Sequence, residues 1–548
     1  MSSHRPPTPD RHPGGRLPGD YQGLNRWKKT LLLAASGALA LMVAGQPTLT
    51  SVAQAAPQSV KATGGTAVVA PPPAPVLDAG SMVLVTDSTG ARAYWKAGYT
   101  GKGVDIAIVD SGVAPVEGLS TPGKVILGPD LSFESQDPAN RYLDTNGHGT
   151  HLAGILAGRD AAASGNYADD VTSFLGMAPD ARLVSVKVAD AQGHTDVTQV
   201  IAAINWVAQH KNDNGMNIRV LLLAFGTDSV SPWEHDPLVF AAEQAWKQGI
   251  FVVVSAGNDG PAAFKQSTLT NLASSPNLFV IGASDTQGTA TLLDDAVAPF
   301  SSGARGERAV DVVAPGSHII GLKAPGSYVD QKFSSTGAYG DRFFRGSGTS
   351  QAAAVAAGAA ALVIQEQPGV TPDALRALLM RTSTPLAGTS WSAQGEGALT
   401  LANVLGRKAG KTKSSNYWSD GLGTLDSARG SNRLAFDGQV LSGQIDIFRA
   451  PFDSAAMAKA EANAFSWSGG AWNGNEWAAS SWSASSWSAS SWSASSWSAS
   501  SWSASSWSAS SWSASSWSAS SWSASSWSAS SWSASSWSAS SWSSAAWE

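Results

Sequence analysis

Cysteine is absent from the 548 residues of this chain, so disulfide bonds, thiolate zinc sites and cysteine nucleophiles are all excluded. Charged side chains are also scarce, at 14% of the residues against the roughly 25% that is usual in soluble domains. The formal net charge is only -6, and no run of basic residues suggests a nucleic-acid partner. Hydrophobic residues make up 43% of the chain, which is enough for a large buried core.

Long hydrophobic runs are missing as well. The stretch LLLAASGALALMVAG near the N-terminus has 15 uncharged residues, fewer than the roughly 20 that span a bilayer. It follows three basic residues and precedes SVAQAA, in which small residues form an A-x-A arrangement. This pattern predicts a secretory signal within residues 1–55, with an uncleaved membrane anchor as the alternative. We therefore expect a protein that is secreted or associated with the cell surface.

Composition divides the remaining chain into four segments. Proline and alanine dominate the first, alternating strand and helix patterns fill the second, the third is rich in Ser, Gly and Ala, and the fourth is a strict repeat. We expect a linker at 56–80, a folded domain at 81–405, a connector at 406–465 and a repeat tail at 466–548.

The folded segment carries near-continuous apolar runs, which are typical of parallel strands buried on both faces. Helical patterns such as VTQVIAAINWVAQHK lie between them. This alternation predicts an α/β domain with a doubly wound, mostly parallel sheet and helices on both faces. Ligands bind such sheets at the carboxyl ends of the strands, so polar residues there are functional candidates. The apolar runs occupy 104–110, 182–188, 218–225, 250–257 and 278–284.

The tail places a tryptophan at every fifth position from Trp467 to Trp547, seventeen in all. A five-residue step turns about 140° on a helix and alternates faces on a strand. Neither geometry gathers the tryptophans into one stripe. The repeat therefore predicts a disordered Ser/Ala chain with regularly spaced apolar groups that associate with the cell wall, the cell surface or each other. An ordered repeat stack and a dedicated wall- or glycan-binding surface are the alternatives.

Four polar residues stand where one element passes into the next. Each has an ordinary explanation when taken alone, since Asp and Asn are favoured in turns and Ser is a favoured helix cap. They are Asp110 in VDSGV, His148 in HGTHLAG, Asn258 in SAGNDG and Ser350 in GTSQAAA.

The sequence argues against two other kinds of catalytic site. The DSG at Asp110 has no second D-[ST]-G partner, although an aspartic protease needs two carboxylates that share a proton. His148 and His151 are three residues apart with no glutamate between them, unlike the H-E-x-x-H of a zinc protease. We expect no metal site here and a structural role for His151.

Taken together, the residues supply a carboxylate, a base and a nucleophile in the order Asp110, His148, Ser350, which is the order of subtilisin. The chain resembles the subtilase family of serine peptidases over about residues 85 to 405. Five blocks carry the resemblance: VDSGV, HGTHLAG, SAGNDG, VVAPG at 312–316 and GTSQAAA.

The resemblance implies an exported serine endopeptidase that hydrolyses polypeptides through an acyl-enzyme. Asp110 would orient His148, His148 would be the general base and Ser350 would attack. Asn258 and the backbone N–H of Ser350 would bind the oxyanion. No cofactor is required, and structural calcium, which many subtilases bind, is allowed without assigned ligands. The residues implied to line the substrate cleft are Ala224, Phe225, Gly226, Ser255, Ala256 and Gly257.

The chain departs from the usual family pattern at three positions. It has Ala224 in place of serine, Gln351 in place of the methionine after the nucleophile and Ala354 in place of proline. No inhibitory prodomain is recognisable between the expected signal and the domain. Because the helix that carries the nucleophile is altered, the alternative function is a catalytically silent surface protein that uses the domain and the Trp tail for binding or self-association.

Overall fold

The computed structural model describes residues 78–463 with short gaps, together with the residue pairs 532–533 and 546–547. The predicted signal, nearly all of the linker and nearly all of the repeat tail lie outside the described residues. The gaps fall at 136, 164, 230, 262–267, 304–307, 413–414, 432, 437–438 and 448–450.

The centre of the fold is a mostly parallel sheet with the strand order β2-β3-β1-β4-β5-β6-β7, and β8 also pairs with β6. Only the short β7 runs antiparallel to its neighbour. Val, Ile and Leu fill the inner strands, and every residue of β1 is buried. The strands are β1 (Asp105–Asp110), β2 (Val125–Asp130), β3 (Arg182–Lys187), β4 (Ile218–Leu223), β5 (Phe251–Ser255), β6 (Phe279–Asp285), β7 (Ala296–Val297) and β8 (Val312–Pro315).

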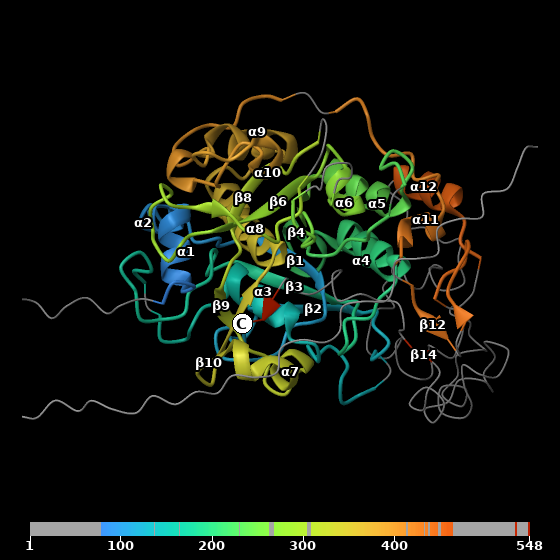
Figure 1. The fold of residues 1–548 in the computed structure, drawn as a ribbon, viewed down its shortest axis with the longest axis horizontal. Helices are drawn as coiled ribbons and strands as arrows, with labels where there is room; N and C mark the ends of the chain where they lie inside the picture. The colour runs from blue at the N-terminus through green and yellow to red at the C-terminus, as the bar shows by residue number, and fades with distance from the viewer. Residues whose placement is uncertain are drawn as a thin grey trace, which may run out of the picture. The chain divides into compact units, whose positions relative to one another are not determined.

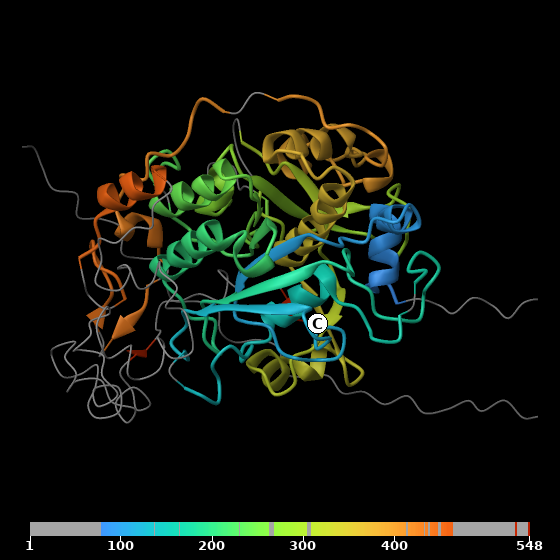
Figure 2. The same ribbon diagram turned by 180° about the vertical axis from the view of Figure 1, so that it is seen from behind.

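Helices cover both faces of this sheet, as the sequence predicts. Helices α3 (His148–Ala157) and α8 (Thr349–Glu366) pack against each other, and α8 also contacts β4, β5, β6 and β8. Helices α4 (Val197–His210) and α5 (Pro237–Lys247) form a second pair, which lies apart from the first in both views of the molecule (Figures 1 and 2).

Helix α8 is the alanine-rich segment, and its small side chains explain its central position. All residues from Thr349 to Ile364 are buried, as expected for a helix that is apolar on every side. A Cβ atom at Gly358 would lie 2.5 Å from Cβ of Met177, so this point of the helix has room only for glycine. The close packing fixes the start of α8 relative to the sheet.

A smaller sheet leads the chain into α8. Its strand β11 (Phe343–Ser347) pairs antiparallel with β9 (Ile319–Leu322) and β10 (Ala338–Tyr339), and at its other end with β15 (Ala546–Trp547). The other elements are α1 (Met82–Thr89), α2 (Ala91–Lys96), η1 (Asp213–Gly215), α6 (Asn271–Ser274), α7 (Tyr328–Gly337), α9 (Pro372–Thr382), α10 (Trp391–Gln394), η2 (Leu401–Asn403), β12 (Ala435–Phe436), β13 (Gln439–Val440) and β14 (Trp532–Ser533).

The predicted connector carries two helices, α11 (Leu425–Arg429) and α12 (Ser454–Ala462), that pack on the domain. Arg429 is fully buried, and its Nε donates to Oδ2 of Asp196 at 2.7 Å. Asp196 in turn caps the N-terminus of α4. A buried ion pair of this kind is costly to break, because the remaining charge would have no partner. The segment is therefore tied to the sheet-covering helices.

Helix α12 also buries a carboxyl group. Glu461 is 5% exposed and lies beside Asn205 of α4 and Gln244 of α5. Burial raises the pKa of this carboxyl from its ordinary value of 4.5 to about 8, and the contact with Asn205 offsets only part of the rise. The folded protein thus holds a proton that the unfolded chain releases near pH 4.5.

We therefore expect the wild-type protein to lose stability as the pH rises from about 4.5 through about 8, because only the unfolded chain is ionised in that window. Glu461→Gln has the shape of the neutral side chain and removes the titration. The variant should match the wild type near pH 4.5 and melt a few degrees higher at pH 9, as measured by calorimetry. Equal melting temperatures at pH 9 would contradict this assignment.

Among the described helices, none is both long enough and apolar enough to cross a membrane.

Candidate active site

Asp110 and His148 meet at the carboxyl edge of the sheet. Asp110 is the last residue of β1, and His148 is the first residue of α3. The Nδ1 atom of His148 lies 2.8 Å from Oδ1 and 3.0 Å from Oδ2 of Asp110. Both residues are buried. A carboxylate that accepts the Nδ1 proton leaves Nε2 as the nitrogen that can take a proton from a nucleophile.

Gly149 allows α3 to start this close to Asp110. A Cβ atom at Gly149 would lie 2.1 Å from the backbone oxygen of Gly112 and 3.2 Å from Oδ1 of Asp110. The first of these distances is far below any real Cβ contact, so no side chain fits. The glycine in HGTH is therefore required by the close approach of two backbones.

Ser350 is the second residue of α8 and is buried. Gly348 links the end of β11 to the start of α8, and its N–H donates to the backbone oxygen of Gly316 at 2.8 Å. Gly316 ends the VVAPG block, so this block supports the turn before the serine. The position puts Ser350 at the positive end of a helix dipole, which favours negative charge beside it.

Asn258 is anchored to the residue that precedes Ser350. Its Oδ1 accepts hydrogen bonds from the backbone N–H of Thr349 at 2.9 Å and from the Thr349 hydroxyl at 3.1 Å. The same hydroxyl accepts from the N–H of Gly257 at 3.1 Å. Because Oδ1 faces Thr349, the donating end of the amide, Nδ2, faces the other way.

Thr349 is the functional residue that the sequence analysis missed. It lies inside the GTS block, but its contacts join residues about 90 positions apart, and no local pattern reports them. Its hydroxyl connects the loop of Asn258 to the start of α8. Thr349 therefore fixes the distance between two groups with separate roles in the predicted chemistry.

The predicted substrate-lining residues follow two neighbouring strands. Residues 224–226 come after β4 and residues 255–257 end and follow β5, and these two strands pair in parallel. The N–H of Ala256 donates to the backbone oxygen of Ile281 at 3.0 Å, and its C=O accepts from the N–H of Thr270 at 3.1 Å. The backbone of this second segment is thus held within the protein.

The three departures from the family pattern lie in the core. Ala224, Gln351 and Ala354 are all at most 2% exposed. Ala354 lies in the first part of α8, which is fully buried and carries mostly small side chains. None of the three changes removes a carboxylate, base or hydroxyl from the site.

His151 points into the packing between α3 and β9. Burial, together with the neighbouring His148, lowers the pKa of His151 to about 3, so its imidazole is neutral at physiological pH. A Cβ atom at Gly321 of β9 would lie 2.8 Å from Nδ1 of His151. The ring therefore fills space beside the backbone of β9.

Metal ligands do not gather in the described part of the chain. There, no three His, Asp or Glu side chains form a group that could hold a metal ion. The described residues therefore offer no ligand set of that kind for structural calcium.

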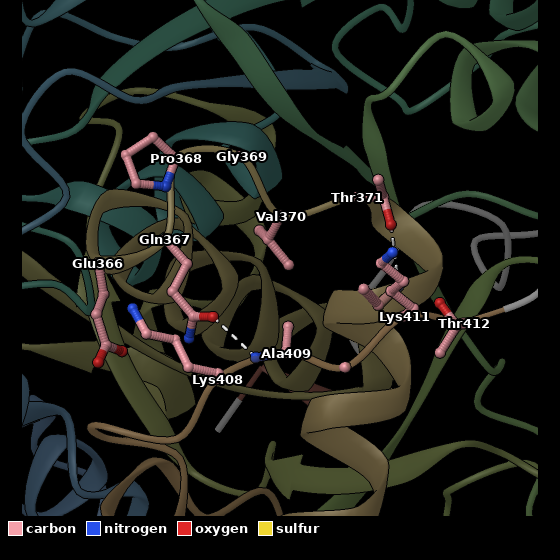
Figure 3. A pocket seen from close by; sticks show the side chains of 12 residues that line it. Glu366, Gln367, Pro368, Gly369, Val370, Thr371, Lys408, Ala409, Lys411 and Thr412 are labelled. Carbon is pink, nitrogen blue, oxygen red and sulfur yellow. Dashed lines mark hydrogen bonds between the residues drawn. The ribbon is translucent and has the colours of Figure 1, made fainter.

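A pocket of about 570 Å³ lies at the far end of α8 (Figure 3). It is lined by residues 366–371 and 408–412 and by Ala374. Glu366 lies sixteen positions after Ser350 on the same helix, which is about 24 Å at the usual rise. No candidate catalytic residue lines this pocket, so it is separate from the site.

Comparison with known proteins agrees with the family resemblance found in the sequence. The model of the subtilase family matches residues 101–406. Serine protease AprX of Bacillus subtilis (strain 168) is 36% identical over 327 residues, which cover 58% of this chain and 70% of that protein. Subtilisin DY of Bacillus licheniformis is 30% identical over 299 residues, or 54% of this chain and 90% of that protein. Minor extracellular protease Epr of Bacillus subtilis (strain 168) is 32% identical over 289 residues, or 52% and 35%.

The family model covers more than half of the chain, and its span contains the sheet, the Asp110–His148 contact and the start of α8. The chain therefore belongs to the subtilase family and is a subtilisin-like serine peptidase.

Proposed function

We propose that Asp110, His148 and Ser350 form the catalytic triad of an exported serine endopeptidase. The observation that carries this proposal is the buried contact of His148 Nδ1 with both carboxylate oxygens of Asp110, at 2.8 and 3.0 Å. His148 starts α3, and α3 packs against α8, whose second residue is Ser350. A base held in one tautomer and a serine at a helix start are the parts that acyl transfer needs.

In acylation, Nε2 of His148 takes the proton from the Ser350 hydroxyl as Oγ attacks the carbonyl carbon of the scissile bond. Asp110 stabilises the imidazolium that forms. His148 then gives the proton to the leaving amine, and the acyl group stays on Ser350 as an ester. A water molecule, activated by the same imidazole, hydrolyses the ester and frees the enzyme.

The negative charge of the tetrahedral intermediate is stabilised by Nδ2 of Asn258 and by the backbone N–H of Ser350. Two observations support this role: Thr349 holds the oxygen end of the Asn258 amide, and Ser350 lies at the N-terminus of α8. Both donors are in place before the charge develops, which is what makes such a site effective.

The substrate is an extended polypeptide that runs alongside residues 224–226 as an added strand. Residues 255–257 act as a wall of the cleft. The bonds that tie Ala256 to Ile281 and Thr270 support the wall role, because they leave its backbone engaged within the protein. The added-strand pairing therefore falls on the segment after β4.

The test is covalent labelling by a fluorophosphonate followed by peptide mapping. Labelling of the wild type at Ser350, lost in Ser350→Ala together with peptide turnover, is the expected result. A protein that takes no label and cleaves no peptide would instead be the catalytically silent surface protein. Labelling at a different serine would contradict the triad assignment.

Export is supported by the pattern of basic, apolar and small residues in 1–55, and one relative carries the name Minor extracellular protease Epr. We infer that the mature enzyme acts outside the cell or at its surface. The Trp repeat then holds it at the cell wall, at the surface or to other copies through its tryptophans.

Deleting residues 466–548 removes β14 and β15, and with β15 the two residues that pair with β11 before Ser350. Hydrolysis of a short soluble peptide should still stay nearly intact, because β9 and β10 also pair with β11 and no residue of the proposed site lies beyond Ser350. The same deletion should move the enzyme from the cell fraction to the medium and reduce self-association. The truncation retains α12 and its buried Glu461. Peptide turnover and the partition between cells and medium are the two measurements.

A full-length variant with serine at the seventeen tail tryptophan positions is the matched control, since it keeps the chain length and removes only the apolar groups. It should partition like the truncated protein. Loss of turnover in the truncated protein would show that the pairing of the tail strands with the domain is required for activity. Unchanged turnover and partition would remove the anchoring role.

A further inference from the structure

The loop before His148 carries a buried carboxylate that the triad mechanism does not use. Asp144 is 5% exposed. Its Oδ1 accepts from the Ser111 hydroxyl at 2.8 Å and from the Gly147 N–H at 2.7 Å, and its Oδ2 accepts from the Thr150 N–H at 2.7 Å. Hydrogen bonds to an ionised acceptor are strong, and three of them fix the carboxylate in one orientation.

Ser111 joins this carboxylate to the catalytic pair. Its backbone N–H donates to Oδ1 of Asp110 at 2.8 Å, and its Oγ lies 3.2 Å from the same oxygen. Its Oγ also accepts from the Gly149 N–H at 3.0 Å. The hydroxyl has one proton, and its shorter contact is with Asp144. Oδ1 of Asp110 is also the oxygen nearest to Nδ1 of His148.

The loop itself is anchored to the sheet beneath the site. Lys187 is the last residue of β3 and stands beside Asp110 in the strand register. Its buried Nζ donates to Oε2 of Glu134 at 2.6 Å and to the backbone oxygen of Leu143. Oε2 of Glu134 also accepts from the Thr145 hydroxyl at 2.6 Å. The residues on both sides of Asp144 are therefore held in place.

We propose that Asp144 is a positioning residue that, through the Ser111 hydroxyl and the N–H groups at the start of α3, holds Asp110 and His148 at hydrogen-bonding distance. The proposal rests on the triad proposed above. Without the Asp144 acceptor, the Ser111 hydroxyl turns its proton to Oδ1 of Asp110. There it competes with the Nδ1 proton of His148 for the same oxygen.

The test uses Asp144→Asn, Ser111→Ala and the double variant in the full chain. Asparagine has the same shape but only one acceptor oxygen, so at least one of the three donors faces an NH2 group. In each single variant we expect kcat to fall about 10²-fold, which is the loss that a small misplacement of catalytic groups causes. KM should change little, because neither side chain is placed at the substrate. The double variant should be no slower than the slower single variant, because Ser111→Ala also removes the hydroxyl that would compete for Oδ1 of Asp110 in Asp144→Asn.

Asp160→Asn is the matched control. Asp160 is 7% exposed and accepts from the Phe174 N–H and from Arg342, outside the catalytic constellation. This variant should melt at a lower temperature and keep its kcat.

A wild-type kcat in folded Asp144→Asn, or losses that multiply in the double variant, would overturn the proposal. If Asp144→Asn does not fold, Ser111→Ala decides the question, and a wild-type kcat in that variant overturns it. Failure of the triad is seen separately, as turnover and labelling that persist in Ser350→Ala. An inactive Ser350→Ala with an unaffected Asp144→Asn therefore rejects only the positioning role.

Discussion

Ser350→Ala should lower kcat on the order of 10⁶-fold, the loss that a subtilisin triad shows when its serine is removed. The variant keeps the start of α8, the Thr349–Asn258 contact and the Asp110–His148 pair, so only the nucleophile is lost. Turnover of a chromogenic peptide is the measurement. The variant should still hydrolyse the peptide faster than the uncatalysed reaction in water, because oxyanion stabilisation and substrate binding remain.

The control for this variant is Ser275→Ala. Ser275 is equally buried and donates its hydroxyl to Glu243 at 2.8 Å, outside the proposed site. Its loss should lower the melting temperature and leave turnover within about twofold of the wild type, as for a structural hydrogen bond. Turnover of Ser350→Ala at the level of this control would exclude Ser350 as the nucleophile.

Asn258→Ala should lower kcat by roughly 10² to 10³ with little change in KM, because the amide donates to charge that exists only in the transition state. The contacts with Thr349 complicate this variant, since alanine also removes the acceptor for the Thr349 N–H. A second substitution separates the two effects.

Asn258→Asp keeps an oxygen for Thr349 and replaces the donor with a second oxygen. If donation to the oxyanion is the role of Asn258, this variant should be at least as slow as Asn258→Ala. Asn277→Ala, which removes a buried amide that donates to Glu243 at 2.8 Å, is the structural control. A rise in KM alone, or an active Asn258→Asp, would mean that the residue only shapes the cleft.

The sheet was largely predictable because its inner strands form near-continuous apolar runs in the sequence. The five apolar runs correspond to β1, β3, β4, β5 and β6, all buried on both faces. Strand β2 was not predicted, because it lies at the sheet edge, is half-exposed in its first part and contains a Gly-Pro step that reads as a turn. Glycine is favoured there, since a Cβ atom at Gly128 would lie 2.9 Å from Cγ2 of Val186 and 3.0 Å from the backbone oxygen of Ser185.

The candidate site was predictable to the extent that its residues mark the ends of elements. Asp110 at a strand end, and His148 and Ser350 at helix starts, carry their signal locally. The supporting contacts do not: Thr349 meets Asn258 across 91 positions and Ser111 meets Asp144 across 33. Such partners become visible only when the backbone brings them together. The buried Glu461 gives no local signal either, because it lies in a segment whose composition resembles a linker.

The position of α8 has a consequence for biosynthesis. The chain emerges from the ribosome with Asp110 and His148 first, and Ser350 follows 202 positions after His148. Because α8 contacts β4, β5, β6 and β8, it cannot take its place until all of these strands exist. A nascent chain is most open to proteolysis while it is unfolded, and domains fold as units during synthesis. The proposed nucleophile, Ser350, is thus in place only after the strands of the sheet, so an incomplete chain cannot cut its neighbours.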